Sequence, residues 1–220
     1  MNVLVSTVPR SGSTLLFNIC RLLFEQAYGK NNTYANWHQF FEEGHEKKNN
    51  IIKVHDRSEK HTKWSNKIIT SVRDLRYIMA SYSDFSKKFN INDAENLKRV
   101  CIGFIKIIES NVAVADYVFK YENYFLDKER VITEIAKCLE IPFEKLNIEI
   151  ILKQIDDIKN KKYNKLDKDL TQMHPNHISP KADKPITQRI TIEQLLFIEN
   201  NFSWFLIKHG YKVSSLIKML

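Results

Sequence analysis

The sequence contains few of the residues that mark a disulfide scaffold, a linker or a membrane span. Three cysteines occur in 220 residues, and an odd number without a C-x-x-C pair predicts reduced, buried thiols. Glycine and proline occur only five times each, and no run of about 18 apolar residues is present. The chain opens directly on a strand-like segment without a basic leader. We therefore expect a cytoplasmic protein without a membrane anchor.

Length and charge narrow the classes of partner. With 220 residues, 43% of them hydrophobic, the chain can bury a core, and we expect residues 1–220 to form a single domain. The 34 Lys and Arg residues exceed the 26 Asp and Glu residues, which gives a formal net charge of +8. This balance favours anionic partners such as nucleotides, nucleic acids, sulfated sugars or a membrane surface. A solvated lysine-rich surface explains part of it, notably the run at 159–168.

The phosphate-binding loop of kinases is also missing. A Walker A loop requires G-x-x-x-x-G-K-[ST], whereas residues 9–14 read PRSGST. This segment nevertheless joins a strand-like run at 3–8 to an apolar helical pattern at 13–28. Free backbone N–H groups at a helix start, the helix dipole and Arg10 together favour a bound anion, most simply a phosphate. The alternative is a Ser/Thr-capped helix that follows an edge turn.

Strand-like and helical segments alternate along the chain, which predicts an α/β fold with a mainly parallel central sheet flanked by helices. Residues 29–49 are polar with several aromatic side chains, and we expect either a loop that lines an acceptor pocket or a small helix on the core. Residues 159–189 predict a long functional or disordered loop. Strands are expected at 3–8, 50–55, 67–72 and 117–121, and helices at 13–28, 74–85, 93–115, 131–139, 144–158 and 191–205.

Basic residues follow three of the predicted strands. Arg10 comes after the first, Lys53 and His55 end the second, and Arg73 follows the third. Ligands of open parallel sheets bind outside the carboxyl ends of the strands. The pattern therefore predicts that these side chains converge on one anion site.

Taken in order, the segments resemble the sulfotransferases that use 3′-phosphoadenosine 5′-phosphosulfate (PAPS). PRSGST is similar to the family's 5′-phosphosulfate loop P-[KR]-S-G-[ST]-[ST], and Lys53-Val54-His55 is similar to its K-x-H strand end. Arg73 with a Ser eight residues later, Ser81, resembles the segment that holds the 3′-phosphate. Tyr121-Glu122-Asn123 resembles the Y-E-[DN] strand end. His177-Ile178-Ser179 and residues 191–194 and 210–211 resemble the C-terminal region of bacterial members.

The resemblance implies a P-loop NTPase-like sulfotransferase fold, PAPS as donor, 3′-phosphoadenosine 5′-phosphate (PAP) as product, and no metal. It implies that Arg73 and Ser81 hold the 3′-phosphate and that Tyr121 lies near the adenine, although a core tyrosine is an equal alternative. Ser179 and Lys181 are further candidates for donor binding. The residues expected around the 5′ end of the donor are Arg10, Ser11, Gly12, Ser13 and Thr14.

The implied reaction moves a sulfuryl group to a hydroxyl or amine of an acceptor. His55 is the candidate general base, and Arg10 and Lys53 would neutralise the developing charge. The short chain favours a small-molecule acceptor, with neither a nucleic acid nor a membrane as partner. The sequence does not indicate an oligomeric state.

Some positions depart from the family pattern. Arg10 stands where many relatives have Lys, and an arginine stabilises charge without acting as an acid. Leu15 replaces an adenine-stacking aromatic residue, and the C-terminal Arg-Lys-Gly phosphate loop is missing, so that Lys181 and Lys184 are possible substitutes. The pair His174 and His177 has metal-like spacing but no third ligand. Two alternative functions remain: a P-loop kinase, and a non-catalytic basic module that binds nucleic acid or sulfated glycan.

Overall fold

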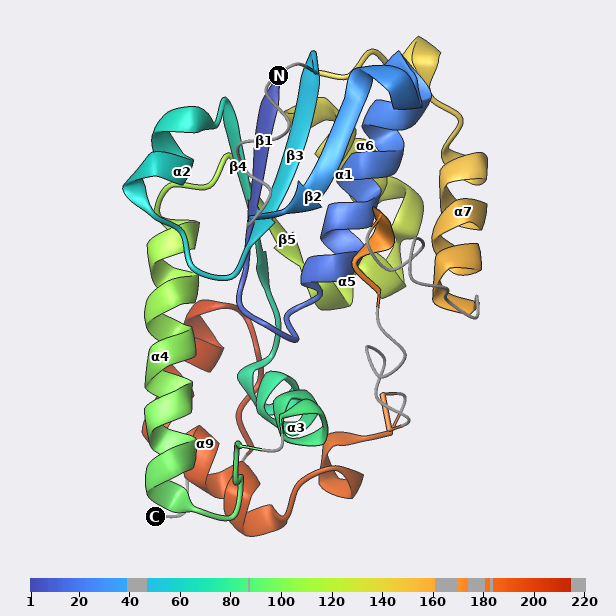
Figure 1. Cartoon of the computed structure of the whole chain (residues 1–220). Coiled ribbons are helices and arrows are strands. Elements are labelled where there is room, and N and C mark those ends of the chain that lie inside the picture. Colours follow the sequence, from blue (N-terminus) through green and yellow to red (C-terminus); the bar gives the residue numbers. More distant parts are fainter. Residues whose placement is uncertain (39–46, 87, 161–169, 174–180, 183, 215–220) are drawn as a thin grey trace. The chain divides into compact units, whose positions relative to one another are not determined.

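The computed structural model describes all residues except 39–46, 87, 161–169, 174–180, 183 and 215–220 (Figure 1). The chain divides into two compact units, which are described separately. The first contains Met1–Val72 and Ile108–Pro175, and the second contains Arg73–Ile107 and Asn176–Leu220. The single-domain assignment stays a prediction.

A parallel sheet forms the centre of the first unit (Figure 1). It has five strands in the order β2-β3-β1-β4-β5, and every neighbouring pair is parallel. This confirms the predicted α/β class. The strands are β1 (Asn2–Ser6), β2 (Thr33–Trp37), β3 (Asn49–Val54), β4 (Lys67–Val72) and β5 (Tyr117–Lys120).

Strand β2 corrects the prediction for residues 29–49. We expected a loop or a small helix there, whereas Thr33–Trp37 pairs along its length with β3. The segment lacks the alternation of apolar and polar residues that identifies a half-buried strand, and each of its five residues is half-buried. Its strand conformation therefore depends on backbone pairing with β3, which a pattern of side chains does not reveal.

Helices cover the sheet. Those at 13–28, 128–138 and 148–160 follow the predicted order, whereas those at 59–64 and 121–126 were not predicted. The apolar pattern at 13–28 forms α1, as predicted, and Tyr121, expected at a strand end, is instead the first residue of a short helix. Pro142 separates two helices, as predicted, and is followed by a 3-10 turn at Phe143–Lys145. The helices of the first unit are α1 (Ser13–Tyr28), α2 (Glu59–Trp64), α5 (Tyr121–Leu126), α6 (Lys128–Cys138) and α7 (Ile148–Asn160).

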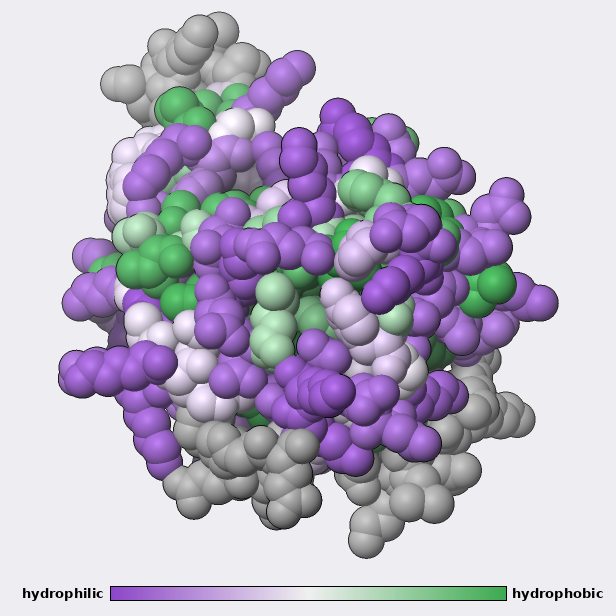
Figure 2. Space-filling model, turned by 90° about the horizontal axis from the view of Figure 1, so that it is seen from above, coloured by the Kyte–Doolittle hydropathy of each residue, from purple (hydrophilic) through white to green (hydrophobic). Residues whose placement is uncertain are grey.

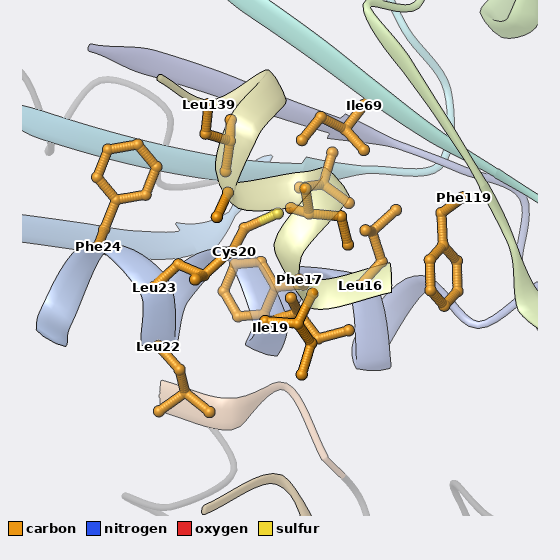
Figure 3. Close-up of a cluster of buried hydrophobic side chains, with 14 of the residues drawn as sticks. Leu16, Phe17, Ile19, Cys20, Leu22, Leu23, Phe24, Ile69, Phe119 and Leu139 are labelled. Atoms are coloured by element: carbon orange, nitrogen blue, oxygen red, sulfur yellow. The ribbon is translucent and has the colours of Figure 1, made fainter. Parts of the chain in front are cut away.

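The strands alternate between two buried faces. Val3, Val5 and Ile69 point to the larger cluster, where they pack with side chains of α1, α6 and α7. Figure 3 shows part of this cluster, with α1 side chains such as Phe17 and Cys20 gathered against the sheet. The intervening residues, including Leu4, point to a smaller cluster that Trp64 of α2 joins. Burial on both faces explains why the central strands have continuous apolar sequences.

The second unit is helical. Asp74 caps α3 (Leu75–Phe85), since its side chain accepts a hydrogen bond from the Arg76 N–H. Thr191 and Gln194 form a capping box at the start of α9 (Ile192–Lys208). Both starts agree with the prediction. Between them lie α4 (Ala94–Val112), whose residues up to Ile107 belong to this unit, and a 3-10 turn at Ile186–Gln188 (η4).

Charged and polar residues cover most of the face seen in Figure 2, with smaller hydrophobic areas between them. In the described part of the chain, no helix is both long enough and apolar enough to cross a membrane. The three cysteines are unpaired, and burial raises the pKa of the Cys101 thiol to about 12. Cys20 and Cys101 are buried, as predicted, whereas Cys138 is only half-buried, and the reduced state of the three thiols stays a prediction.

Candidate functional site

The loop that follows β1 turns sharply before α1 begins. Arg10 and Gly12 both adopt positive φ angles, 67° and 95°, and Gly12 is the N-cap of α1 without a side-chain cap. A Cβ atom on Gly12 would lie 2.4 Å from Cδ2 of Tyr121. Only glycine therefore fits this position, and the Tyr121 ring packs directly against the loop. The start of α1 thus has no side-chain cap bond at Gly12, and the backbone N–H groups and dipole of a helix start favour an anion.

The hydroxyl of Ser11 points into the protein. Ser11 is completely buried, and its Oγ lies 2.8 Å from the carbonyl oxygen of Val8 and 2.6 Å from Oγ of Ser71. Because Ser11 donates its single hydroxyl proton to Val8, Ser71 donates to Ser11. This pair joins the loop to the end of β4. Ser11 can therefore offer a ligand its backbone N–H, but the hydroxyl is engaged in holding the loop in shape.

Lys53 is a buried cation beside this loop. Its side chain arises from β3, it is 3% exposed, and Nζ donates a 2.7 Å hydrogen bond to Oγ1 of Thr14. Burial, with a further contribution from the charge of Arg10, lowers the pKa of Lys53 to about 7. No acidic residue in the described ranges forms an ion pair with it. An anion placed here would restore the charge that burial disfavours.

His55 lies just after β3 and is fixed in one orientation. Its Nδ1 lies 2.7 Å from the carbonyl oxygen of Thr7. A carbonyl only accepts hydrogen bonds, so Nδ1 carries the proton and Nε2 has a free lone pair. Burial and the charge of Lys53 lower the pKa of His55 to about 4. The ring is therefore neutral at neutral pH, as a proton acceptor must be.

Trp37 contacts both Lys53 and His55. It is the last residue of β2 and pairs in register with Lys53. Its ring lies 5.4 Å from Nζ of Lys53 and 4.8 Å from the His55 ring, which it meets edge-on at 71°. The sequence shows Trp37 as one of several aromatic residues in a polar stretch. Its place in the site depends on β2, the strand that the sequence analysis did not predict.

The segment after His55 is also tied down. The guanidinium of Arg57 donates hydrogen bonds to Oδ1 of Asn111, Oγ1 of Thr62 and the carbonyl and hydroxyl oxygens of Ser110. Asn111 in turn bonds both the hydroxyl and the carbonyl of Ser6 in β1. Arg57 thus stabilises the chain on the far side of His55. Its role was not predicted, because the local sequence does not show that Ser110 and Asn111, more than fifty residues away, lie beside it.

The expected convergence is confirmed for Arg10, Lys53 and His55. The charge of Arg10 lowers the pKa of Lys53, the charge of Lys53 lowers that of His55, and all three residues lie at the carboxyl ends of β1 and β3. Arg73 directly follows β4 but belongs to the second unit. Its convergence with the other three therefore stays a prediction.

Within the second unit, Arg73 and Ser81 flank the same helix face. The guanidinium carbon of Arg73 lies 5.9 Å from the centre of the Tyr77 ring. Ser81 is 4% exposed and follows Tyr77 by one helical turn, so Tyr77 and Ser81 share a face of α3. A buried network supports the start of this helix: Arg76 pairs with both Asp74 and the fully buried Glu199 of α9.

The C-terminal candidates are less well placed. Lys181 lies in an exposed turn, whereas Ser179 lies outside the described residues, and so do His174 and His177. The described residues contain no group of three or more His, Cys, Asp or Glu side chains arranged to hold a metal ion. The prediction of a metal-independent site is not tested by this observation.

A parallel sheet, a glycine-containing loop at a helix start and a Lys-x-His strand end are the features on which the sequence resemblance rests. The comparisons make this more specific. A family model described as the sulfotransferase domain matches residues 1–188, so the chain belongs to the sulfotransferase family. No sequence among the curated proteins matches it.

Solved structures show the same fold. Mouse sulfotransferase SULT7A1 complexed with PAP has a TM-score of 0.64 at 15% sequence identity, over 93% of this chain and 83% of that one. Retinol dehydratase in complex with androsterone and the inactive cofactor PAP has a TM-score of 0.52 at 15% identity, over 72% of this chain and 66% of that one. These likenesses confirm the predicted P-loop-like sulfotransferase fold.

Proposed function

We propose that this sulfotransferase takes the sulfuryl group from PAPS, releases PAP, and transfers the group to a hydroxyl or amine of a small molecule. The residues of the first unit suit the 5′ end of such a donor. Gly12 allows the loop to turn beside Tyr121, and the start of α1 has no side-chain cap. Lys53 is a buried cation without a carboxylate partner among the described residues. Both features favour an anion.

We assign each candidate residue a role in donor binding. Arg10, Lys53 and the N–H groups of Ser11 to Thr14 bind the 5′-phosphosulfate, and Tyr121, packed on Gly12, lies near the adenine. Arg73 and Ser81 bind the 3′-phosphate through charge-assisted hydrogen bonds. Lys181, exposed in its turn, contributes a more distant positive charge, and Ser179 keeps the donor-binding role that the resemblance implies.

PAPS supplies an activated sulfuryl group. Its transfer requires a deprotonated acceptor that attacks sulfur and a site that stabilises the oxygen that leaves. His55 Nε2 removes the proton of the acceptor as its oxygen or nitrogen bonds to sulfur. The 2.7 Å bond from Nδ1 to Thr7 keeps the lone pair of Nε2 available. Lys53 and Arg10 neutralise the charge that develops as the bond between sulfur and the bridging oxygen breaks. The orientation of His55 beside Lys53 is the observation that carries this proposal.

The remaining assignments belong to the same proposal. The protein acts in the cytoplasm, without a metal, and its acceptor is neither a nucleic acid nor a membrane component. Trp37, beside both Lys53 and His55, forms part of the acceptor side of the site, since it stands next to the proposed base.

Calorimetry and an activity screen test the proposal. The protein is titrated with PAP in the presence of EDTA and, separately, with ATP and Mg²⁺. Purified protein is then incubated with ³⁵S-labelled PAPS and acceptor pools of phenols, alcohols, amines and sugars. PAP binding with EDTA and label transfer support the proposal. A preference for ATP and Mg²⁺ would instead favour a kinase, and PAP binding without any transfer would favour a binding module.

A further inference from the structure

Arg189 is a buried cation whose hydrogen-bonding capacity is largely unused. Its side chain is 1% exposed, and its one ion pair in the described part of the chain joins Nη2 to Oδ2 of Asp84 at 3.1 Å. The Nε and Nη1 atoms are buried without a hydrogen-bond partner. Buried donors are nearly always satisfied in native proteins, and a buried charge with unfilled donors is costly. Such a group requires an explanation.

The contacts of Arg189 place it along one stretch of α3. Its guanidinium carbon lies 5.9 Å from the centre of the Tyr77 ring, and Nη2 bonds Asp84. Ser81 lies between these positions, four residues after Tyr77 and three before Asp84, so all three share a helix face. The guanidinium group of Arg189, which lies near Tyr77 and bonds Asp84, is therefore close to the turn of α3 that contains Ser81.

Arg73 approaches the same ring. Its guanidinium carbon also lies 5.9 Å from the centre of Tyr77. Two arginines from distant parts of the sequence thus share one aromatic side chain, and the carboxylate that pairs with Arg189 belongs to Asp84, which is itself 28% exposed. The short turn η4, which packs on α3, positions Arg189 there. The unfilled Nε and Nη1 donors of Arg189, with the Arg73 guanidinium beside the same ring, fit a phosphate dianion.

We propose that Arg189 is a further donor-binding residue, whose Nε and Nη1 groups bind the same phosphate as Arg73 and Ser81. This inference rests on the proposed function, in which that phosphate is the 3′-phosphate of the donor. It assigns the role to a buried arginine that follows the matched family segment, in place of the exposed Lys181 and Lys184. Both guanidinium groups lie within cation–π distance of the Tyr77 ring, which offsets part of their mutual repulsion.

The test compares two ligands that differ by this phosphate. PAP and adenosine 5′-phosphate, which lacks the 3′-phosphate, are titrated into the full-length protein and into Arg189→Gln by calorimetry. We expect Arg189→Gln to weaken PAP binding by about tenfold or more, as loss of a charge-assisted hydrogen bond predicts, and to leave the affinity for adenosine 5′-phosphate within about twofold. Arg99→Gln, an exposed arginine of the same unit, is the matched control and should change neither affinity.

A second variant separates ligand binding from a purely structural ion pair. If Arg189 serves only to pair with Asp84, Asp84→Asn and Arg189→Gln lose the same interaction and weaken PAP binding alike. If Arg189 binds the phosphate, Asp84→Asn removes a competing negative charge and strengthens PAP binding. Unchanged PAP affinity in Arg189→Gln, an equal loss for both ligands, or parallel losses in the two variants would overturn the inference.

Arg73→Gln distinguishes this inference from the proposed function. If Arg73→Gln selectively weakens PAP while Arg189→Gln does not, only the role of Arg189 is wrong. If the unmodified protein binds PAP no better than adenosine 5′-phosphate, the proposed 3′-phosphate site fails, and the inference fails with it.

Discussion

Replacement of Gly12 by alanine tests the packing of the anion-binding loop. The new Cβ would lie 2.4 Å from Cδ2 and 3.0 Å from Cε2 of Tyr121, so the ring must retreat by about 1 Å to reach an ordinary contact. The φ angle of 95° adds strain, about 1–2 kcal/mol for a residue with a side chain. Overpacking costs about 1–3 kcal/mol more. We expect a loss of about 2–5 kcal/mol in the free energy of unfolding, or about 4–20 °C in Tm.

Two other glycines provide controls for this experiment. Gly29 also has a positive φ, 86°, but a Cβ there meets nothing within 4 Å, so Gly29→Ala measures backbone strain without a clash. Gly103 lies inside α4 and has open space, so Gly103→Ala should leave stability unchanged or raise it by up to about 1 kcal/mol. Only Gly12→Ala should weaken PAP binding, because only this variant moves Tyr121.

Urea unfolding, thermal melts and PAP titration measure these effects. The double variant Gly12→Ala with Tyr121→Ala isolates the steric contribution to the loss of stability. Tyr121→Ala should cost less stability in the Gly12→Ala background than in the wild type, because there it also removes the clash with the new Cβ. The reasoning would be refuted if Gly12→Ala were as stable as Gly103→Ala, or if it lost stability but kept full PAP affinity.

Four further predictions address the proposed roles of single side chains. His55→Ala should lower kcat by about 10²–10⁴-fold with little change in the PAP dissociation constant; undiminished turnover removes His55 from the mechanism. Between about pH 6.5 and 4 the unfolded chain binds a proton at His55 that the folded protein does not, so the free energy of unfolding falls as the pH falls through this range; urea titrations of His55→Asn should show a smaller decrease. Ser11→Ala should cost about 1–2 kcal/mol of stability through its lost buried bonds and leave PAP affinity almost unchanged, whereas a large loss of affinity would show that the hydroxyl contacts the ligand. At about pH 8, PAP binding should be accompanied by uptake of a proton at Lys53. The measured binding enthalpy should then vary with the ionisation enthalpy of the buffer, and a binding enthalpy that is the same in all buffers contradicts this prediction.

The elements that the sequence identifies are those whose stability depends on side-chain pattern. The apolar runs at 50–55 and 67–72 predict the two strands beside β1, and the spacing of leucines at 13–28 predicts α1 at its observed bounds. Strand β2 could not be found in this way, because its five half-buried residues depend on backbone hydrogen bonds to β3. Trp37 was therefore noticed as an aromatic residue, but its contact with Lys53 and His55 was not predictable.

The candidate site shows the same division. The order of Arg10, Lys53 and His55 at strand ends follows from parallel topology, so their proximity could be predicted. The direction of a small side chain could not: the Ser11 hydroxyl points to Val8 and Ser71, although its place in the loop suggested a ligand contact. The burial of Arg189 was equally hidden, because it depends on how η4 packs against α3, about a hundred residues away in the sequence.

Lys53 and Arg189 show why the net charge of the chain is a poor guide to its specificity. Most of the excess lysines are exposed, where water and salt screen their charge. Lys53 and the Arg189 side chain are buried, 3% and 1% exposed, and neither has a full set of anionic partners among the described residues. A buried cation without such partners destabilises the folded protein, and an anion that reaches it offsets this cost. Under the proposed function, a ligand with a single phosphate satisfies one of these cations, whereas a donor with anionic groups at both ends satisfies both. On that proposal, selectivity for the donor depends on the burial of these two charges rather than on the number of charges in the chain.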